Sequence, residues 1–209
     1  MANIARGGFH WVGGKDGCNT MPVEPHVVAS AYGTAIFFGD VLKMNGTNGD
    51  VVLCGATDTP DFVCVGVARY KDSTGVVRSG RFLPASTTYS NGTLLDNPEA
   101  SVLLCVPVAR QKFEVCCDEG AATEAAAQGM VNLNATFVAT AGSTTTGQSG
   151  HVLDTSTAAT TNTLTWRIIG IVRQGNINTT FNDVTLANFR VIVEANLSHQ
   201  ASPGTSTGV

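Results

Sequence analysis

The six cysteines are the residues of this chain with the most potential for chemistry, as metal ligands, redox groups or nucleophiles. They are Cys18, Cys54, Cys64, Cys105, Cys116 and Cys117. None of them forms a CxxC pair, the spacing typical of zinc ligands, and most lie inside apolar runs. We therefore interpret them as buried free thiols that pack as small hydrophobic groups. We expect no structural disulfide, because no export signal is visible, and Cys54 with Cys64 is the first pair to check.

Two other short patterns place potentially reactive side chains near one another. His151 and Asp154, in the sequence HVLD, would seat an imidazole beside a carboxylate, and Asp58 and Asp61, in DTPD, would offer two carboxylates to a cation. We interpret the first as the polar end of a loop and the second as a turn, because calcium usually takes six or more oxygen ligands. The sequence contains no GxSxG, HExxH, Walker or GxGxxG pattern. We therefore assign no catalytic, cofactor-binding or metal-binding residue and expect a protein that is not an enzyme.

Residues 1–25 are expected to form an extended arm. They include five glycines and two prolines and show neither helical nor strand periodicity. Phe9 and Trp11 lie two positions apart, so in an extended chain their side chains point the same way. Such a segment cannot form a core of its own and must dock on its own body or on a neighbour. We expect it to contribute to attachment and little to the stability of the body.

Residues 26–199 are expected to form a single β-rich body, followed by a flexible tail at 200–209. Turn signals recur every 8–12 residues in this part of the chain, a spacing typical of a sandwich or barrel. The alternation over 189–199 predicts a strand with one buried face. Strands are predicted at 27–31, 34–44, 51–54, 62–70, 76–83, 131–139, 164–172 and 189–199. The run 102–117 is predicted to be one long strand or two, because Pro107 forces an edge or a bulge. Residues 71–75 are predicted to form a hairpin loop between the strands at 62–70 and 76–83. The sequence thus predicts an all-β fold, a barrel- or sandwich-like body of about eight to ten strands, with one short helix at 119–128 capped by Gly129.

Charge and hydropathy exclude several classes of protein. Only 13% of the 209 residues are charged, and the formal net charge is −4. The 12 basic residues are scattered along the sequence, which disfavours binding of nucleic acid. No apolar run reaches the 18 residues of a membrane span, and the N-terminus lacks the apolar region of a signal peptide. We therefore expect no nucleic-acid or membrane partner and synthesis in a cytoplasm.

Several short motifs follow one another in order along the chain. They are Met1-Ala2-Asn3, Arg6-Gly7-Gly8-Phe9, Thr34–Leu42, Val65-Gly66-Val67, Ser149-Gly150, Leu153-Asp154, Ser156-Thr157, Thr163-Leu164, Arg167–Val172, Asn176, Val193, Asn196 and His199. In this order they resemble the small virion proteins that decorate, or cement, the capsids of tailed phages. The six cysteines and the Thr-rich stretch at 140–163 depart from that pattern.

The resemblance implies a non-enzymatic virion structural protein on the outer surface of a phage capsid, made in the cytoplasm of the bacterial host. Its partners would be the major capsid protein and copies of itself, as a homotrimer that reinforces contacts between capsomers. Arg6, Phe9 and Trp11 are then the candidate capsid-docking residues. An extended arm suits this role, because it can lie along a groove or add a strand to a sheet edge.

Three other functions are weighed against this interpretation. A receptor- or glycan-binding β module of a phage tail or head fibre would need exposed aromatic side chains on a platform. Only 7% of the residues are aromatic, and of the two tryptophans Trp166 lies in an apolar strand. A major capsid protein would need a long spine helix, for which there is no amphipathic segment. An enzyme is the least favoured of the three.

Overall fold

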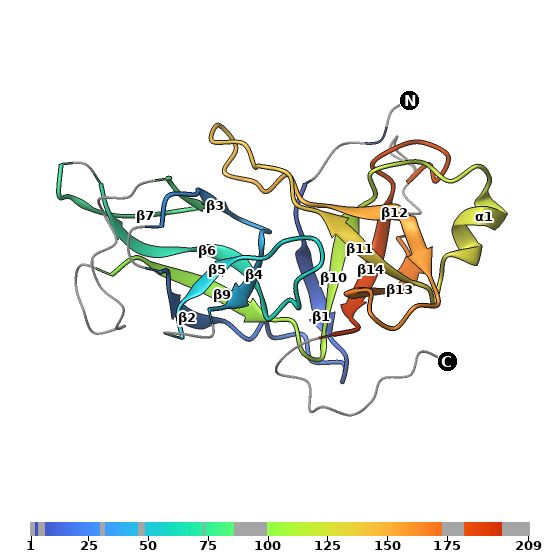
Figure 1. Ribbon diagram of the computed structural model, residues 1–209, viewed down its shortest axis with the longest axis horizontal. Coiled ribbons are helices and arrows are strands. Elements are labelled where there is room, and N and C mark those ends of the chain that lie inside the picture. Colours follow the sequence, from blue (N-terminus) through green and yellow to red (C-terminus); the bar gives the residue numbers. More distant parts are fainter. Residues whose placement is uncertain are drawn as a thin grey trace.

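The computed structural model describes residue 3 and residues 7–29, 32–45, 49–72, 74–85, 100–172 and 182–197. Strands predominate in these ranges, which contain one helix, α1 (Glu124–Gly129). The molecule is elongated, with α1 at one end of its long axis and β7 (Val77–Gly80) towards the other (Figure 1). The prediction of a β-rich chain with one short helix is therefore confirmed.

The first sheet has six antiparallel strands in the order β1-β10-β14-β13-β11-β12. In chain order these are β1 (His10–Gly14), β10 (Gln111–Cys116), β11 (Asn134–Val138), β12 (Val152–Ala159), β13 (Trp166–Ile171) and β14 (Arg190–Ala195). The predicted alternation in β14 is confirmed, since Val191 and Val193 are buried while the residues between and beside them are only half-buried. Val193 pairs with Phe113 on one side and Ile168 on the other, at the centre of the sheet.

The second sheet has the order β2-β9-β6-β4-β5, and β7 pairs with the outer part of β6. Its remaining strands are β2 (Glu24–Val27), β4 (Val41–Met44), β5 (Val51–Leu53), β6 (Phe62–Lys71) and β9 (Val102–Pro107). A small third sheet pairs β3 (Ile36–Phe37) with β8 (Phe82–Leu83). The predicted hairpin loop after Lys71 is confirmed by the pairing of Lys71 with Val77.

Pro107 marks the point where the chain passes from one sheet to the other. It ends β9 in the second sheet, and after a turn at Val108–Arg110 the chain enters β10 in the first sheet. Arg110 adopts a positive φ of 60° in this turn. The apolar run from 102 to 117 is therefore two strands in two sheets, the second of the two possibilities that the proline allows.

The helix begins later than the sequence predicts. Thr123 is its N-cap, and the Thr123 hydroxyl accepts a hydrogen bond from the Ala126 amide at 3.1 Å. Gly129 is the last helical residue and Met130 the C-cap, so the prediction that Gly129 caps the helix is wrong. Ala127 is the buried residue of the helix. Within the described ranges, no helix has the length and apolar character needed to cross a membrane.

The expected barrel- or sandwich-like body is not confirmed, because no sheet in the described ranges closes into a barrel. Those ranges contain fourteen strands where about eight to ten were expected, since turns and bulges divide the longer apolar runs. One core cluster takes side chains from both six-stranded sheets, including Phe113 and Val193 from the first and Val63 and Val106 from the second. The other face of the second sheet packs a separate cluster around Phe62 and Leu103.

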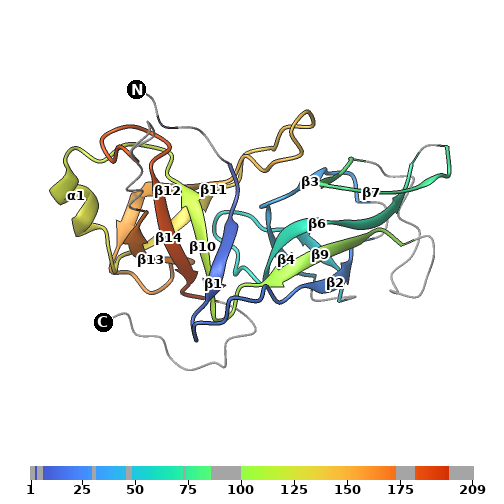
Figure 2. The ribbon, with the colours of Figure 1, turned by 180° about the vertical axis from the view of Figure 1, so that it is seen from behind.

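The described part of the arm expected at residues 1–25 docks on the body of the same chain, one of the two possibilities that the sequence leaves open. The side-chain amide of Asn3 donates to the backbone carbonyls of Asp183, Leu186 and Ala187 at 2.7–3.2 Å. Strand β1 pairs with β10 as the edge of the first sheet, and β2 is an edge of the second (Figure 2). The segment lacks a core of its own because it uses the core of the body. The predicted tail at 200–209 lies outside the described residues.

Candidate functional site

The three candidate docking residues do not form an exposed site. Arg6 lies outside the described residues. Phe9 is completely buried and stacks on Trp166, with ring centroids 4.4 Å apart. Trp11 is half-buried against the same core cluster, and its indole N–H donates to the Gln111 side-chain oxygen at 2.7 Å. Phe9 and Trp11 thus contact the same core, as their spacing predicts, but this core is their own and Phe9 has no surface left for a partner.

The cysteines are mostly packing groups in the core. Cys18 is exposed and the other five are buried. Burial raises the pKa of the Cys54 and Cys64 thiols to about 12, and it raises that of Cys105 well above its usual value. Because the thiolate is the nucleophile and the metal ligand, this burial opposes reactivity. Cys54 and Cys64 belong to different core clusters, and the residue opposite Cys64 is Cys105, so Cys64 with Cys105 replaces Cys54 with Cys64 as the first pair to check for a disulfide.

The two aspartates of the DTPD turn are used separately. The Asp58 carboxylate lies 2.7 Å from the Lys43 ammonium, whose hydrogen bond is the main cause of the lowered pKa of Asp58. Asp61 is buried and accepts a hydrogen bond from the Met44 amide at 2.9 Å. This division of roles favours a structural turn over a cation site. Across the described ranges, no three His, Cys, Asp or Glu side chains converge as metal ligands would.

His151 faces an aspartate that is far away in the sequence. Its Nε2 atom lies 3.5 Å from Oδ1 of Asp40, and both side chains are almost completely buried. Asp154, the predicted neighbour of His151, instead accepts hydrogen bonds from the amide and hydroxyl of Ser156. The sequence signal that was missed is that Gly39-Asp40 and Ser149-Gly150 both belong to the motifs of the resemblance.

Backbone and hydroxyl groups hold this pair in a defined arrangement. The Val41 amide donates to Nδ1 of His151 at 3.2 Å, so a neutral ring carries its proton on Nε2, facing Asp40. The other carboxylate oxygen of Asp40 accepts from the Phe37 amide at 2.7 Å, and the Ser149 hydroxyl also bonds the carboxylate. Burial raises the pKa of Asp40 to about 6 and lowers that of His151 to about 4.

Three distant segments meet around this pair, at a place that we name the central joint: Gly8, Phe9, Gly39, Asp40, Ser149 and His151. The Gly8 amide donates to the His151 carbonyl at 2.8 Å, and the Phe9 amide donates to the Gly39 carbonyl at 2.9 Å. Gly8 and Gly39 both have φ near +90°, and a Cβ atom on either one would lie 2.9 Å from the Cα atom of the other. The joint therefore needs glycine at both positions.

The central joint lacks the geometry of a catalytic triad. The Ser149 hydroxyl bonds the Asp40 carboxylate, and it also accepts from the His151 amide at 2.9 Å. The imidazole therefore has no serine hydroxyl positioned for it to deprotonate, a contact that nucleophilic catalysis requires. All three side chains are buried. The arrangement is suited to joining segments of the chain.

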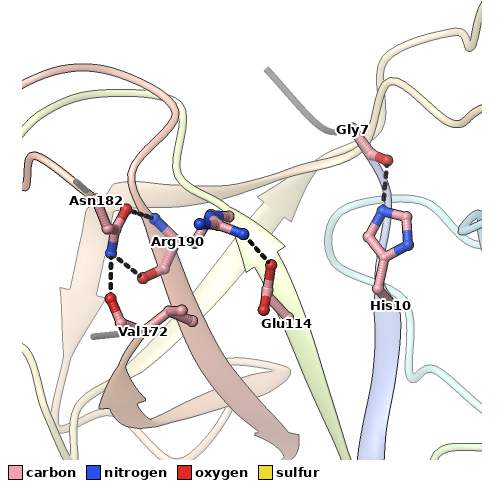
Figure 3. Close-up of polar contacts among 6 residues, drawn as sticks. All are labelled: Gly7, His10, Glu114, Val172, Asn182 and Arg190. Atoms are coloured by element: carbon pink, nitrogen blue, oxygen red, sulfur yellow. Dashed lines mark hydrogen bonds and ion pairs between the residues drawn. The ribbon is translucent and has the colours of Figure 1, made fainter. Parts of the chain in front are cut away.

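The outer face of the first sheet carries ion pairs and hydrogen bonds between strands. Arg190 on β14 pairs with Glu114 on β10 at 2.9 Å (Figure 3). The Asn182 side chain bonds the carbonyls of Val172 and Arg190 and the amide of Arg190, and so ties β14 to the end of β13. At the sheet edge, the His10 ring bonds the Gly7 carbonyl at 3.1 Å. These contacts mainly connect strands of the first sheet to one another.

The most exposed apolar side chains lie elsewhere, at the tip of the hairpin formed by β6 and β7. Val76 is 51% exposed and Val77 is 58% exposed, the largest values among the exposed large hydrophobic residues of the described ranges. The order of apolar and polar residues in this hairpin does not predict that it is exposed. Its exposure is decided by the absence of any described segment packed over β7.

No protein-family model, no curated protein and no solved structure shows significant similarity to this chain.

Proposed function

We propose that the chain is a capsid decoration protein, a non-enzymatic virion protein that binds the outer surface of a phage capsid and reinforces contacts between capsomers. One observation carries the proposal. Three of the motifs behind the resemblance, around Phe9, Gly39-Asp40 and Ser149-Gly150, contact one another at the central joint. Motifs that matched by chance would have no reason to meet in space. Their contact supports a shared structural plan with the decoration proteins.

The distribution of reactive groups agrees with a structural role. Asp40 and His151 are buried in the central joint, and five of the six thiols are in the interior. The two most exposed large hydrophobic side chains of the described residues, Val76 and Val77, in contrast, lie in the β6–β7 hairpin. A shell filled with DNA is under outward pressure, and a protein that bridges capsomers resists it through added contact area. Several weak contacts made at the same time hold such a protein on the shell.

The glycan-binding alternative is less well supported. A sugar platform needs exposed aromatic faces, whereas Trp166 is completely buried and Trp11 is packed against the core. We no longer propose a docking role for Phe9, because its side chain is also completely buried. We propose that attachment uses the surface of the folded body, and that the protein acts as a homotrimer, because closed cyclic symmetry is a common solution for repeated contacts.

Binding to capsid shells tests the proposal directly. Empty shells of the major capsid protein from the same phage, made without this chain, are mixed with the purified protein and sedimented. We expect saturable co-sedimentation, with a copy number comparable to that of the capsid protein, and added density at three-fold positions by electron microscopy. Failure to bind these shells, or a few copies confined to the tail in native virions, would contradict it. Binding to a sugar array without binding to shells would favour the glycan module.

A further inference from the structure

The hairpin of β6 and β7 projects towards the end of the molecule opposite α1 (Figures 1 and 2). Its strands pair Val67 with Gly80, Tyr70 with Arg78 and Lys71 with Val77. Residues 74–81 are all exposed, and β7 is exposed at each of its four positions. A strand in a stable sheet normally buries one face. The hairpin thus presents both faces of β7 to the surroundings.

Hydrogen bonds and an ion pair hold the exposed tip of the hairpin in a defined conformation. The Asp72 amide bonds the Val76 carbonyl, and Gly75, at φ +80°, closes the turn by donating its amide to the Asp72 carbonyl. One carboxylate oxygen of Asp72 accepts from the amide and hydroxyl of Thr74 and from the amide of Val76, at 2.6–3.1 Å. The other oxygen pairs with Arg78. The hydroxyl of Thr74 and the guanidinium of Arg78 hold the pKa of Asp72 well below its usual value.

A preformed tip loses little conformational entropy when it binds, which favours recognition. Val76 directly precedes Val77, the first residue of β7, so we expect their side chains to point to opposite faces of the hairpin, as successive residues of an extended chain do. A flat partner surface would bury only one of them. A cleft that admits the tip would bury both, and burial of exposed apolar area is the main favourable term in association.

The charge of the hairpin differs in sign from that of the rest of the chain. Residues 69–81 contain Arg69, Lys71, Arg78 and Arg81 against the single acidic residue Asp72, a formal charge of +3. Because the whole chain carries −4, the remaining residues carry −7. Four of the 12 basic residues of the chain thus lie in this hairpin, so basic residues are less evenly scattered than the sequence analysis states. Such a separation of charge orients a protein as it approaches an acidic surface.

We propose that the β6–β7 hairpin is the docking element of this protein, and that its tip inserts Val76 and Val77 into an apolar cleft with an acidic rim on the major capsid protein. This proposal rests on the proposed function and names the surface that performs it. A basic hairpin with an apolar tip would also fit the minor groove of DNA. The protein partner is favoured, because the other residues carry a charge of −7 that would be repelled by phosphates.

The test compares two exposed apolar sites on the same protein. The first variant is Val76→Ser combined with Val77→Ser, and the control is Val138→Ser, a residue on β11 that is 37% exposed. All three valines are exposed, so both variants should keep the thermal midpoint of the wild type. Affinity for the empty capsid shells is measured by sedimentation. We expect a loss of about tenfold or more in the hairpin variant and no change in the control.

A second measurement follows the salt dependence. The affinity of the wild type for the shells should fall as the salt concentration rises from about 0.05 to 0.5 M, because exposed charges are screened. If the wild type binds the shells and the hairpin variant binds equally well, the proposal is overturned while the proposed function stands. If the wild type does not bind the shells at all, the proposed function itself fails. Binding to duplex DNA that is lost in the hairpin variant would overturn the protein partner in favour of nucleic acid.

Discussion

Replacement of Asp40 by asparagine should make the stability of this protein fall on mild acidification. The reason lies in the opposite shifts of the buried pair, in which burial raises the pKa of Asp40 to about 6 and lowers the pKa of His151 to about 4. In the unfolded chain these groups titrate near 3.9 and 6.5, respectively. Folding therefore changes the proton affinity of both side chains, in opposite directions.

The sign of each contribution follows from linkage. Asp40 has a raised folded pKa, so its contribution to stability is fully present below its unfolded pKa and is lost as the pH rises through about 6. His151 has a lowered folded pKa, so its contribution is present above its unfolded pKa and is lost as the pH falls through about 4. Between about pH 4 and 6 the two slopes oppose each other. In the wild type the pair should make stability nearly independent of pH in this window.

Each single variant removes one of the two slopes. One pKa unit corresponds to about 1.4 kcal/mol, and each pKa is shifted by roughly two units or slightly more. Asp40→Asn leaves the histidine, so the free energy of unfolding should fall by about 3 kcal/mol as the pH is lowered from about 6.5 to 4. His151→Gln leaves the aspartate, and its free energy of unfolding should rise by a similar amount over the same range. Cys64 and Tyr32, which also lie near Asp40, have raised pKa values and do not titrate there.

Urea denaturation of the wild type and both variants across this pH range provides the measurement. Each substitution also removes hydrogen bonds and lowers stability at every pH, so the readout is the slope relative to the wild type and not the absolute value. Groups elsewhere titrate equally in the three proteins and cancel in the comparison. Curves that run parallel to the wild type, or slopes of the same sign in both variants, would refute the reasoning.

Three further predictions concern the packing of the chain. Phe9→Ala should destabilise the protein by about 3–5 kcal/mol in chemical denaturation, because its ring is buried against Trp166. The control, Val12→Ala at an exposed position, should change stability by less than about 0.5 kcal/mol. Equal effects of the two substitutions would show that β1 is not part of the core. Gly39→Ala should lower the thermal midpoint by several degrees, because the new Cβ atom would lie 2.9 Å from the Cα atom of Gly8. Gly17→Ala should have a smaller effect, because it adds the same strain of a positive φ but its Cβ atom meets no other atom within 4 Å. In the native state a thiol reagent should label Cys18 rapidly and the five buried cysteines only on unfolding; mass spectrometry should find no disulfide in promptly blocked protein, and a linked Cys64–Cys105 peptide would contradict that expectation.

Local features of the fold were predictable where the signal lies within a few neighbouring residues. The alternation in β14 identifies a half-buried strand, because successive side chains of a strand face opposite sides. The sequence Asp72 to Gly75 identifies the hairpin turn, since the aspartate accepts bonds from the residues just after it and the glycine adopts a positive φ. The sequence predicts the helix but not its ends, because residues before Thr123 could also begin a helix.

Contacts between distant segments could not be predicted in this way. Phe9 has the same local pattern whether it packs on its own body or on a partner, and only the position of Trp166 decides between them. Similarly, His151 has Asp154 nearby in the sequence, yet its ring faces Asp40, since the β3–β4 turn is brought against the start of β12. The sequence by itself determined a β-rich chain of low charge with a preformed hairpin. The tertiary structure alone decided which apolar groups are buried and which titratable groups meet, because both depend on how the two sheets pack together.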